Sequence, residues 1–382
     1  MRILYVYKSI GLLAGMERVL TDKMNYLSER LGYDVYLITY EQGTNPFSYE
    51  LSPRIMHKDL GVLLYTKSRY PFPQRLLVYQ RMRKLLKNRL YKEVDKINPD
   101  IIVATNYSFP IIDIIANVPG RSKRILETHV TKDAVLKSGS FDDFLFFKLV
   151  AYFYDRHMLH QIRKFDVLVT LTEQDKKKWQ NIVSHTATIP NVLTRFPTET
   201  AGLANKCLIS VGRYDGQKGY DLLIRAWSLV VTKHSDWQMH IYGSGPLKNS
   251  LTKMIEEYGV TSSFILNPPT PEIYDKYLEH SIYVMSSRFE GFGLVLIEAM
   301  SCGLPCISFD CPSGPSEIIR NGEDGILVEN GNIEKLSEAI CRLIENEHER
   351  KLMGMEARKN SLRYSKDRIM GDWDTLFRKL LI

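Results

Sequence analysis

The sequence predicts an α/β protein made of two doubly wound domains, each built on a parallel sheet. Its 382 residues are too many for one ordinary domain and suit two. Short runs rich in β-branched residues alternate with amphipathic stretches, which is the pattern of βαβ units. A linker-like segment over residues 190–205, rich in Pro, Thr, Gly and Asn, separates two such series.

The predicted strands fall into one series before the linker and one after it. They are RILYVY, DVYLITY, IIVAT, RILET, VLVTL and TATIP in the first, and CLISVG, WQMHIYG, SFILN, IYVMS, PCISF and GILV in the second. Helices of the first half are predicted over residues 15–30, 74–97, 142–162 and 173–183. Ligands of such sheets bind beyond the carboxyl ends of the strands, so the loops after the strands are where binding residues are expected.

The composition is that of a globular cytoplasmic protein. Hydrophobic residues make up 44% and charged residues 25% of the chain. No apolar run reaches the roughly 18 residues of a membrane span, and MRILYVYKSIG is too short for a signal peptide and fits a first strand. The cysteines number five and show neither a disulfide framework nor paired CxxC motifs, so we expect reduced core or loop residues.

The positive charge of the chain lies in its first half. Residues 1–190 carry 29 Lys and Arg against 19 Asp and Glu, and the remainder carries 22 against 25. Residues 69–92 contain eight basic residues, no acidic one, and apolar residues at helical spacing. This segment is either an amphipathic helix for an anionic membrane surface or a solvated helix that packs on its own domain. It lacks a nucleic-acid recognition module, so no nucleic-acid partner is expected.

Glycines and cations follow the first strand of each series. In IGLLAGMERVL, Gly15 precedes a helix that begins near Glu17, so the backbone there either approaches an anion or sugar oxygen or simply turns. In VGRYDGQKG, Arg213 and Lys218 lie among Gly212 and two further glycines between a strand and a helix. Two cations and a glycine-rich turn suit a diphosphate without a bound metal, because they neutralise its charge and admit it closely.

Two further loops carry small or acidic residues. IYGSGP, with Gly243, either holds a nucleotide or only turns the chain. In SSRFEGFGLVLIEAM, Glu290 lies in a loop, and Glu298 lies in the second turn of a helix that is apolar on nearly all sides. That helix must be buried, so Glu298 needs a partner, either ligand hydroxyls or an arginine of the core. A phosphate cannot be this partner, because like charges repel.

The order of these motifs resembles the retaining glycosyltransferases of family 4, which have the two-lobed GT-B fold. The resemblance covers essentially the whole chain, and EGFGLVLIEAM with its glutamate spacing is the most specific part. It implies two Rossmann-like domains facing a cleft. Residues 1–195 would form the acceptor-side domain, residues 196–365 the nucleotide-sugar domain, and residues 366–382 a helix that crosses back to the first domain.

The resemblance also implies a role for each motif. Arg213 and Lys218 would bind the donor diphosphate, Glu290 would contact the hydroxyls of the donor sugar, and Glu298 would hold the ribose. His129, in ETHVTKD, would contact the donor sugar from the first domain, although a lone histidine is also common as a satisfied loop residue. The implied catalytic residues are His129, Glu290, Arg213 and Lys218, and the implied donor-binding residues are Gly15, Gly212, Arg213, Lys218, Gly243, Glu290, Gly291, Phe292, Gly293, Leu294 and Glu298.

Three positions depart from the family pattern. The first loop has Ala14-Gly15 where a Gly-Gly pair is common, and the linker has Asn191-Val192 where many members have Asn-Gly. Residues 267–272, NPPTPE, replace the more usual leucine-glycine or aromatic-glycine at the base pocket. Contacts with the base are therefore carried over less directly than contacts with the diphosphate.

The expected reaction is transfer of a hexose or N-acetylhexosamine from a UDP-sugar, with retention and with neither metal nor cofactor. No nucleophile with a paired base and no Asp-x-Asp motif follows a strand. The expected acceptor is a glycan, such as a polyprenyl-diphosphate oligosaccharide of capsule or lipopolysaccharide assembly, at the inner face of the cytoplasmic membrane. FDCPSGPSEII favours N-acetylgalactosamine or galactose as the sugar. The alternatives are a nucleotide-sugar epimerase and a non-catalytic nucleotide-sugar binding subunit.

Overall fold

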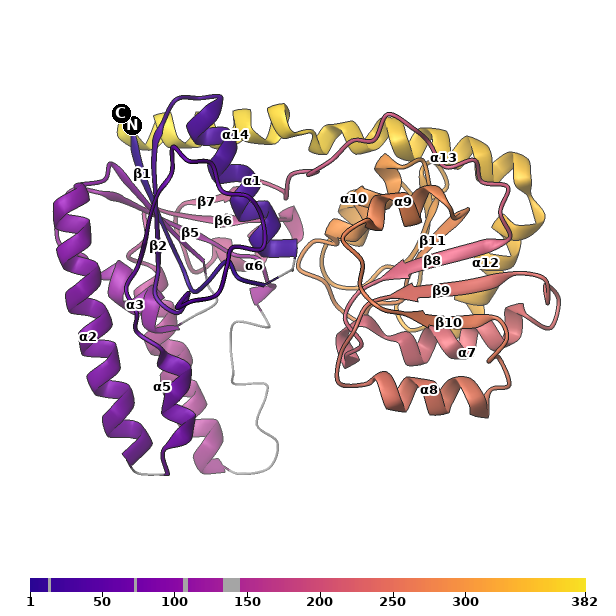
Figure 1. Cartoon of the computed structure of the whole chain (residues 1–382), viewed down its shortest axis with the longest axis horizontal. Helices are drawn as coiled ribbons and strands as arrows, with labels where there is room; N and C mark the ends of the chain where they lie inside the picture. The colour runs from indigo at the N-terminus through magenta and orange to yellow at the C-terminus, as the bar shows by residue number, and fades with distance from the viewer. Residues whose placement is uncertain (13–14, 72–73, 106–108, 133–144) are drawn as a thin grey trace. The chain divides into compact units, whose positions relative to one another are not determined.

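A computed structural model describes residues 1–12, 15–71, 74–105, 109–132 and 145–382 (Figure 1). The chain divides into two compact units. Unit 1 contains Met1–Val192 and Ile369–Ile382, and unit 2 contains Leu193–Arg368. Each unit has one parallel sheet and its own apolar core. None of the helices that the structure describes is both long enough and apolar enough to cross a bilayer.

The sheet of unit 1 is parallel and doubly wound. Its strands are Arg2–Tyr7 (β1), Asp34–Thr39 (β2), Met56–Asp59 (β3), Ile101–Thr105 (β4), Lys123–Glu127 (β5), Val167–Thr170 (β6) and Thr186–Thr188 (β7). Their order in the sheet is β3-β2-β1-β4-β5-β6-β7. All side chains of β4 are buried, as is typical of a central parallel strand. The order reverses between β1 and β4, so the loops that follow these strands diverge there.

The helices of unit 1 cover the sheet. They are Gly15–Glu29 (α1), Gln74–Ile97 (α2), Phe109–Ala116 (α3), Leu145–Ile162 (α5) and Glu173–Gln180 (α6), with the short turn Leu64–Arg69 (η1). The hydroxyl of Thr172 caps α6 by accepting a hydrogen bond from the Asp175 N–H at 3.1 Å. The helix predicted over residues 142–162 is described from Leu145 onward, because residues 142–144 lie outside the described part of the chain.

The C-terminal helix Lys366–Leu381 (α14) joins unit 1 through its aromatic face. Trp373 and Phe377 are buried there, as predicted for packing residues. The ammonium of Lys23 lies 4.1 Å from the centre of the Trp373 ring, and the Tyr33 hydroxyl donates a hydrogen bond to Asp374. Both contacts are with residues that precede the helix by more than 300 positions, so α14 is part of the core of unit 1.

Unit 2 repeats the architecture with a smaller sheet. Its strands are Cys207–Val211 (β8), Gln238–Tyr242 (β9), Phe264–Asn267 (β10), Ile282–Met285 (β11), Cys306–Phe309 (β12) and Gly325–Val328 (β13). Their order is β10-β9-β8-β11-β12-β13, and every pairing is parallel. The helices are Tyr220–Val230 (α7), Lys248–Glu257 (α8), Ile273–Leu278 (α9), Leu294–Ser301 (α10), Pro315–Ile318 (α11), Ile333–Glu345 (α12) and Glu347–Ser361 (α13), with the short turns Gly216–Lys218 (η2) and Leu362–Tyr364 (η3).

The predicted fold class of two Rossmann-like α/β sheets with a long C-terminal helix is confirmed. The observed strands lie within the predicted runs or begin one residue earlier, and α6 ends at Gln180 instead of residue 183. The sequence analysis missed β3, whose sequence MHKD alternates between exposed and half-buried positions. This strand lies at the edge of the sheet and carries no apolar run, so its sequence offers no strand signal.

The packing of α14 gives a test of the fold. Phe377 is fully buried, so a Phe377→Ala substitution should lower the free energy of unfolding by about 3 to 5 kcal/mol. The Trp373 ring centre lies 5.4 Å from that of Phe377, so its fluorescence reports on urea unfolding at this site. Leu381→Ala, at the exposed end of the same helix, is the control and should stay within roughly 0.5 kcal/mol of wild type. Equal unfolding midpoints for the two variants would contradict the packing.

Candidate functional site

The loops after β8 and β11 lie together in unit 2. The strand order reverses between these two strands, and doubly wound sheets bind ligands at such a reversal. Several hydrogen bonds join the loops directly, among them two to backbone carbonyls of the glycine turn. The Arg288 N–H donates to the Gln217 carbonyl at 2.8 Å, and the Ser286 hydroxyl donates to the Lys218 carbonyl at 2.9 Å. The motifs VGRYDGQKG and SSRFEGFG, which are far apart in the sequence, therefore form one site.

Glycines allow the loops of this site to pack backbone against backbone. A Cβ on Gly243 would lie 1.9 Å from the carbonyl oxygen of Gly212. Gly219 has a φ of +61°, and a Cβ there would lie 2.1 Å from the carbonyl oxygen of Ser286. No side chain fits at either position, because real Cβ atoms do not come so close to backbone oxygen. The packing of the loops thus explains these two glycines before any ligand is considered.

The central contact of the site joins Lys218 to Glu290. The Lys218 Nζ lies 2.6 Å from the Glu290 Oε1, and the two side chains are 15% and 9% exposed. The Ser287 hydroxyl donates a second hydrogen bond to the same oxygen at 2.6 Å. The backbone of Glu290 is also fixed, since its N–H donates to the Pro312 carbonyl and its carbonyl accepts from the Ser313 N–H. The carboxylate is therefore held in place and paired, and Ser287 is a participant that the sequence analysis missed.

The two arginines beside this contact differ in their surroundings. The side chain of Arg213 is 75% exposed and pairs with Asp215 at 3.1 Å, so it can turn toward a ligand. Arg288 binds both carboxylate oxygens of Asp221, at 2.8 and 2.6 Å, and donates to the Gly216 carbonyl at 2.9 Å. The hydrogen bonds from Arg288 lower the pKa of Asp221. Arg288 thus holds the glycine turn. The sequence feature that could have pointed to Arg288 is its position two residues before Glu290.

Helix α10 begins at the site. Gly293 precedes it with a φ of +102°. Within the described part of the chain, no backbone or side-chain acceptor is found for the N–H groups of Phe292, Gly293 and Leu294. Such amides at a helix start favour an anion. The Phe292 ring is buried and lies 5.5 Å from the Tyr364 ring, which anchors this turn.

Glu298 lies in the second turn of α10 and is buried. The phenol of Tyr277, in α9, donates a hydrogen bond to its Oε2 at 3.3 Å. Burial first, and the charge of Glu298 second, raise the pKa of Tyr277 well above its usual value, so this phenol stays protonated and can donate. The sequence analysis left ligand hydroxyls and an arginine open as partners for Glu298, and the structure adds a phenol.

Gly15 and His129 belong to unit 1, whereas the other predicted site residues belong to unit 2. Gly15 is the exposed first residue of α1, and its neighbour Ala14 lies outside the described residues. His129 follows β5, and its side chain is 3% exposed. Its Nε2 lies 3.1 Å from the Oε1 of Glu127, whose other oxygen accepts a hydrogen bond from Lys23 at 2.5 Å. The histidine is therefore part of a buried charged group.

Comparison with known proteins shows which family and fold this chain resembles. Residues 197–360 match the family model of group 1 glycosyl transferases. An uncharacterised glycosyltransferase of Haemophilus influenzae is 29% identical, over 97% of this chain and 98% of its own. The crystal structure of a Staphylococcus aureus TarM mutant with fondaparinux, α-GlcNAc-glycerol and UDP superposes with a TM-score of 0.77 at 18% identity, covering 98% of this chain and 99% of that one.

Residues 197–360 thus carry the sequence signature of the group 1 glycosyl transferases. The fold of the chain is GT-B, which its structural relatives share. A second relative, the poly(ribitol-phosphate) α-N-acetylglucosaminyltransferase of Staphylococcus aureus, is 30% identical over 58% of this chain. The chain spans 46% of the length of that relative, so the match concerns part of the larger protein.

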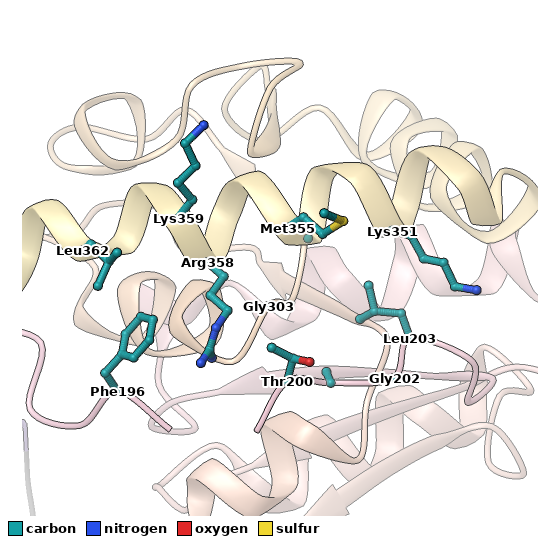
Figure 2. A pocket seen from close by; sticks show the side chains of 12 residues that line it. Phe196, Thr200, Gly202, Leu203, Gly303, Lys351, Met355, Arg358, Lys359 and Leu362 are labelled. Carbon is teal, nitrogen blue, oxygen red and sulfur yellow. The ribbon is translucent and has the colours of Figure 1, made fainter. Parts of the chain in front are cut away.

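A cavity of about 550 Å³ lies away from the predicted donor residues (Figure 2). It is an apolar groove between the linker and α13, and Arg358 lies over the Phe196 ring at 4.2 Å on one side of it. The lining residues are Phe196, Thr200, Ala201, Gly202, Leu203, Gly303, Lys351, Gly354, Met355, Arg358, Lys359 and Leu362. None of them belongs to the loops after β8, β9 or β11, so the groove is separate from the candidate site.

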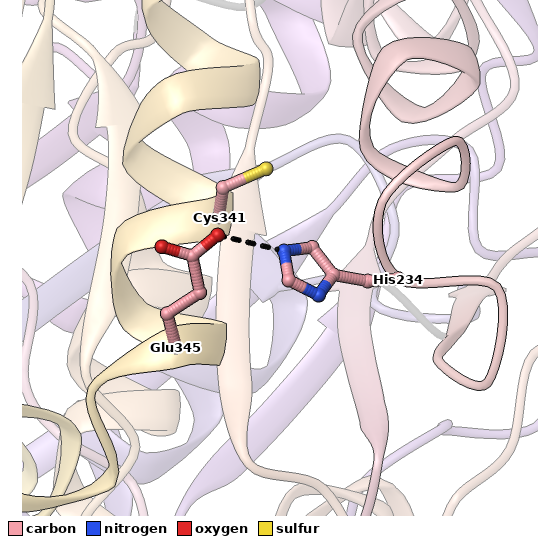
Figure 3. A group of neighbouring side chains, drawn as sticks. All are labelled: His234, Cys341 and Glu345. Carbon is pink, nitrogen blue, oxygen red and sulfur yellow. Dashed lines mark hydrogen bonds and ion pairs between the residues drawn. The ribbon is translucent and has the colours of Figure 1, made fainter.

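Among the described residues, one group of three side chains has donor atoms close enough together for a metal ion (Figure 3). The donor atoms of His234, Cys341 and Glu345 lie within 4.8 Å of one another, and the His234 Nε2 is 3.0 Å from the Glu345 Oε1. An ion pair therefore accounts for two members. Burial raises the pKa of the Cys341 thiol, which disfavours the thiolate that binds metals. Since His234 precedes β9, the group lies at the amino edge of the sheet, opposite the candidate site.

The close approach of the glycine loops predicts a sharp difference between two substitutions. Gly243→Ala should displace the loop after β8 and lower turnover roughly 100-fold, since a displacement of about 1 Å costs that much. Gly216→Ala is the matched control, because nothing lies within 4 Å of a Cβ there, and it should leave turnover unchanged. Steady-state kinetics on both variants, with circular dichroism to confirm folding, makes the comparison. Full activity in Gly243→Ala would show that the loop tolerates displacement.

Proposed function

We propose that this chain is a glycosyltransferase that moves a hexose or N-acetylhexosamine from a UDP-sugar to a lipid-linked glycan. The observation that carries this proposal is the contact between Lys218 and Glu290, at the reversal of strand order in unit 2. A cation from a glycine turn and a carboxylate from the neighbouring loop meet at one point. A nucleotide sugar presents a diphosphate beside sugar hydroxyls, which are the groups that such a cation and carboxylate bind.

The donor would exchange the internal partners of the site for its own groups. Lys218, with Arg213, would bind the diphosphate, and the amides at the start of α10 would add hydrogen bonds to it. Glu290, released from Lys218, would accept hydrogen bonds from the sugar hydroxyls, and Ser287 would keep its carboxylate oriented. Glu298 would accept from the ribose beside the Tyr277 phenol. These residues supply charge and orientation without covalent chemistry.

Retention follows if the acceptor attacks the anomeric carbon from the face that the diphosphate leaves. The bond from the anomeric carbon to the diphosphate oxygen breaks, and the bond to the acceptor oxygen forms on the same face. The departing oxygen takes the acceptor proton, so no side chain needs to act as base. The negative charge that develops on the diphosphate is stabilised by Lys218, Arg213 and the amides of α10. His129 would contact the donor sugar from unit 1.

The relatives support the choice of donor class. The Staphylococcus aureus relative is named as an N-acetylglucosaminyltransferase, and the TarM structure contains UDP together with α-GlcNAc-glycerol. The UDP of the TarM structure favours UDP as the nucleotide, and both names favour an N-acetylhexosamine as the sugar. The segment FDCPSGPSEII favours N-acetylgalactosamine or galactose instead, so the stereochemistry at C4 is the question for a donor panel.

A charge-removing double substitution tests the assignment of the diphosphate site. Arg213→Ala with Lys218→Ala should lower kcat/KM for the preferred UDP-sugar by roughly 100-fold or more, because each cation stabilises the leaving group. Arg225→Ala with Lys233→Ala removes the same charge from exposed positions of unit 2 and should have no effect. UDP-, GDP- and ADP-sugars are each incubated with lipid-linked acceptors, and the products are identified by mass spectrometry.

Three outcomes of this panel would reject the proposal. Transfer at the wild-type rate by the Arg213→Ala and Lys218→Ala variant would remove these residues from the site. A free sugar isomer without a glycosylated acceptor would identify an epimerase. Tight UDP binding with no turnover of any donor would identify a binding subunit.

The start of α2 supports the membrane part of the proposal. The buried apolar side chains of this helix, Leu86, Leu90 and Val94, lie in its second half. In its first turn, Leu76 and Leu77 are 53% and 63% exposed, and Figure 1 shows this end of the helix projecting beyond the strands of unit 1. Exposed leucines within the basic segment 69–92 suit an anionic lipid surface, where a lipid-linked acceptor would be found.

Vesicle binding tests this surface. Leu76→Ser with Leu77→Ser should weaken sedimentation with vesicles of phosphatidylglycerol and phosphatidylcholine by roughly ten-fold or more, because each leucine loses apolar burial. Salt at about 1 M should also weaken binding, since it screens charges beyond roughly 3 Å. Leu352→Ser, an equally exposed leucine of unit 2, is the control. Equal binding of the wild type to anionic and neutral vesicles would contradict the role of the basic segment.

A further inference from the structure

A buried pair of opposite charges lies beneath His129 in unit 1. The Lys23 Nζ donates a hydrogen bond to the Glu127 Oε2 at 2.5 Å, and the two side chains are 2% and 3% exposed. Ion pairs buried this completely seldom stabilise a fold relative to apolar residues of the same size, because both charges lose their hydration. The location of this pair therefore calls for a role other than stability.

Glu127 connects the pair to His129. Its Oε2 accepts a hydrogen bond from Lys23, and its Oε1 lies 3.1 Å from the His129 Nε2, within ion-pair distance. Burial acts to raise the pKa of Glu127, but Lys23 and then His129 outweigh it and bring the pKa down to about 2. The carboxylate thus stays ionised near neutral pH, and the imidazole permanently faces a fixed negative charge.

Aromatic rings and backbone hydrogen bonds hold the two ends of this group. The Lys23 ammonium lies 4.1 Å from the ring centre of Trp373 and 5.4 Å from that of Tyr5, so two aromatic rings contact it in addition to the carboxylate. The Thr128 N–H and hydroxyl both donate to the Val169 carbonyl, at 2.8 and 3.2 Å, which fixes the chain just before His129. The Glu127 carboxylate and the backbone of Thr128 are therefore both held by hydrogen bonds.

The group also reaches the first turn of α1. Burial raises the pKa of Glu17, whereas a hydrogen bond from Tyr7 at 3.1 Å and the charge of His129 act to lower it. His129 therefore lies near enough to the start of α1 to interact with its first acidic residue. Glu127 from β5 and Glu17 from α1 interact with this imidazole, and these glutamates in turn interact with Lys23 from α1 and with Tyr5 and Tyr7 from β1.

We propose that Lys23 and Glu127 are positioning residues for His129 in sugar transfer. The proposal rests on the proposed contact between His129 and the donor sugar. Lys23 holds the Glu127 carboxylate, and the carboxylate draws the His129 Nε2 toward itself, which leaves Nδ1 as the ring nitrogen available to a ligand. Trp373 adds the C-terminal helix to this arrangement, because its ring packs on the Lys23 ammonium.

Isosteric neutral substitutions separate this role from a structural one. Lys23→Met and Glu127→Gln each leave one buried charge without its partner, so each should lower the thermal unfolding midpoint. The double variant Lys23→Met with Glu127→Gln removes both charges and should recover most of that midpoint. The control is Lys58→Met with Glu93→Gln, which removes a different Lys–Glu pair of unit 1. The Lys58 Nζ lies 2.6 Å from the Glu93 Oε1, and neither residue is one of the predicted site residues.

Kinetics and binding are then measured on the double variant. We expect kcat with the preferred UDP-sugar to stay roughly 10- to 100-fold below wild type, because misplacing a catalytic group lowers the rate by about that factor. The Kd for UDP, measured by calorimetry, should be unchanged. The control variant should keep both values. Wild-type kcat in the refolded double variant would overturn the proposal and leave the pair as a structural feature only.

Two further measurements distinguish the failure of this proposal from failure of the proposed function. His129→Gln with full kcat would remove His129 from the reaction whatever Lys23 and Glu127 do. In protein with ¹⁵N-labelled histidine, the ring signals of His129 are identified by their absence in His129→Gln. Those signals should move in Glu127→Gln and stay in place in the control, and unmoved signals in Glu127→Gln would overturn the proposal without any reliance on turnover.

Discussion

The contact between Lys218 and Glu290 is the interaction on which the arrangement of unit 2 depends. At 2.6 Å it joins the glycine turn after β8 to the loop after β11, and both side chains are mostly buried. Each charge is stable there because the other is present. A ligand that supplies a diphosphate for the lysine and hydroxyls for the carboxylate can replace the contact without leaving either charge unpaired. The same pair thus holds the two loops together and is suited to a nucleotide sugar.

Backbone geometry brings these two charges together. The parallel strands β8 and β11 are neighbours in the sheet, although more than 70 residues separate them in the chain. Their loops can pack on each other only if small residues lie where the backbones meet, and Gly219 meets Ser286 in this way. Arg288 then binds Asp221 and the carbonyl of Gly216, which holds the glycine turn against the loop after β11.

Both units place a buried Lys–Glu pair at the carboxyl end of a strand. In unit 2 the glutamate follows β11, and in unit 1 Glu127 is the last residue of β5. The pair in unit 1 is more fully buried, and Lys23 is enclosed by the rings of Trp373 and Tyr5. Each pair lies at the carboxyl edge of a parallel sheet, which is where such sheets bind ligands. Burying a charge costs free energy, and in both units this cost falls at positions where ligand binding is expected.

Much of the fold could be predicted from the sequence, because β-branched runs and amphipathic periodicity are local properties. The strand β3 could not, since its residues MHKD form an edge strand through pairing with β2 and not through apolar content. The glycine-rich loops and the two glutamates of EGFGLVLIEAM were recognisable as candidate residues from residue type and spacing. Ser287 and Arg288 lie in the same stretch. Their neighbours in the sequence do not show whether a serine or arginine there binds a carboxylate or is exposed to solvent.

The sequence by itself determined the two α/β series, their linker and the residue types available to the site. Only the tertiary structure decided which charges are paired. Glu298 was expected to need a ligand or an arginine, and the Tyr277 phenol donates to it. His129 looked like a lone histidine, and Glu127 and Lys23 lie behind it. The reason is physical, because a buried charge is stabilised by groups that lie within a few ångströms of it in space. The order of the strands in the sheet determines which groups those are, and this order cannot be read from any short stretch of the sequence.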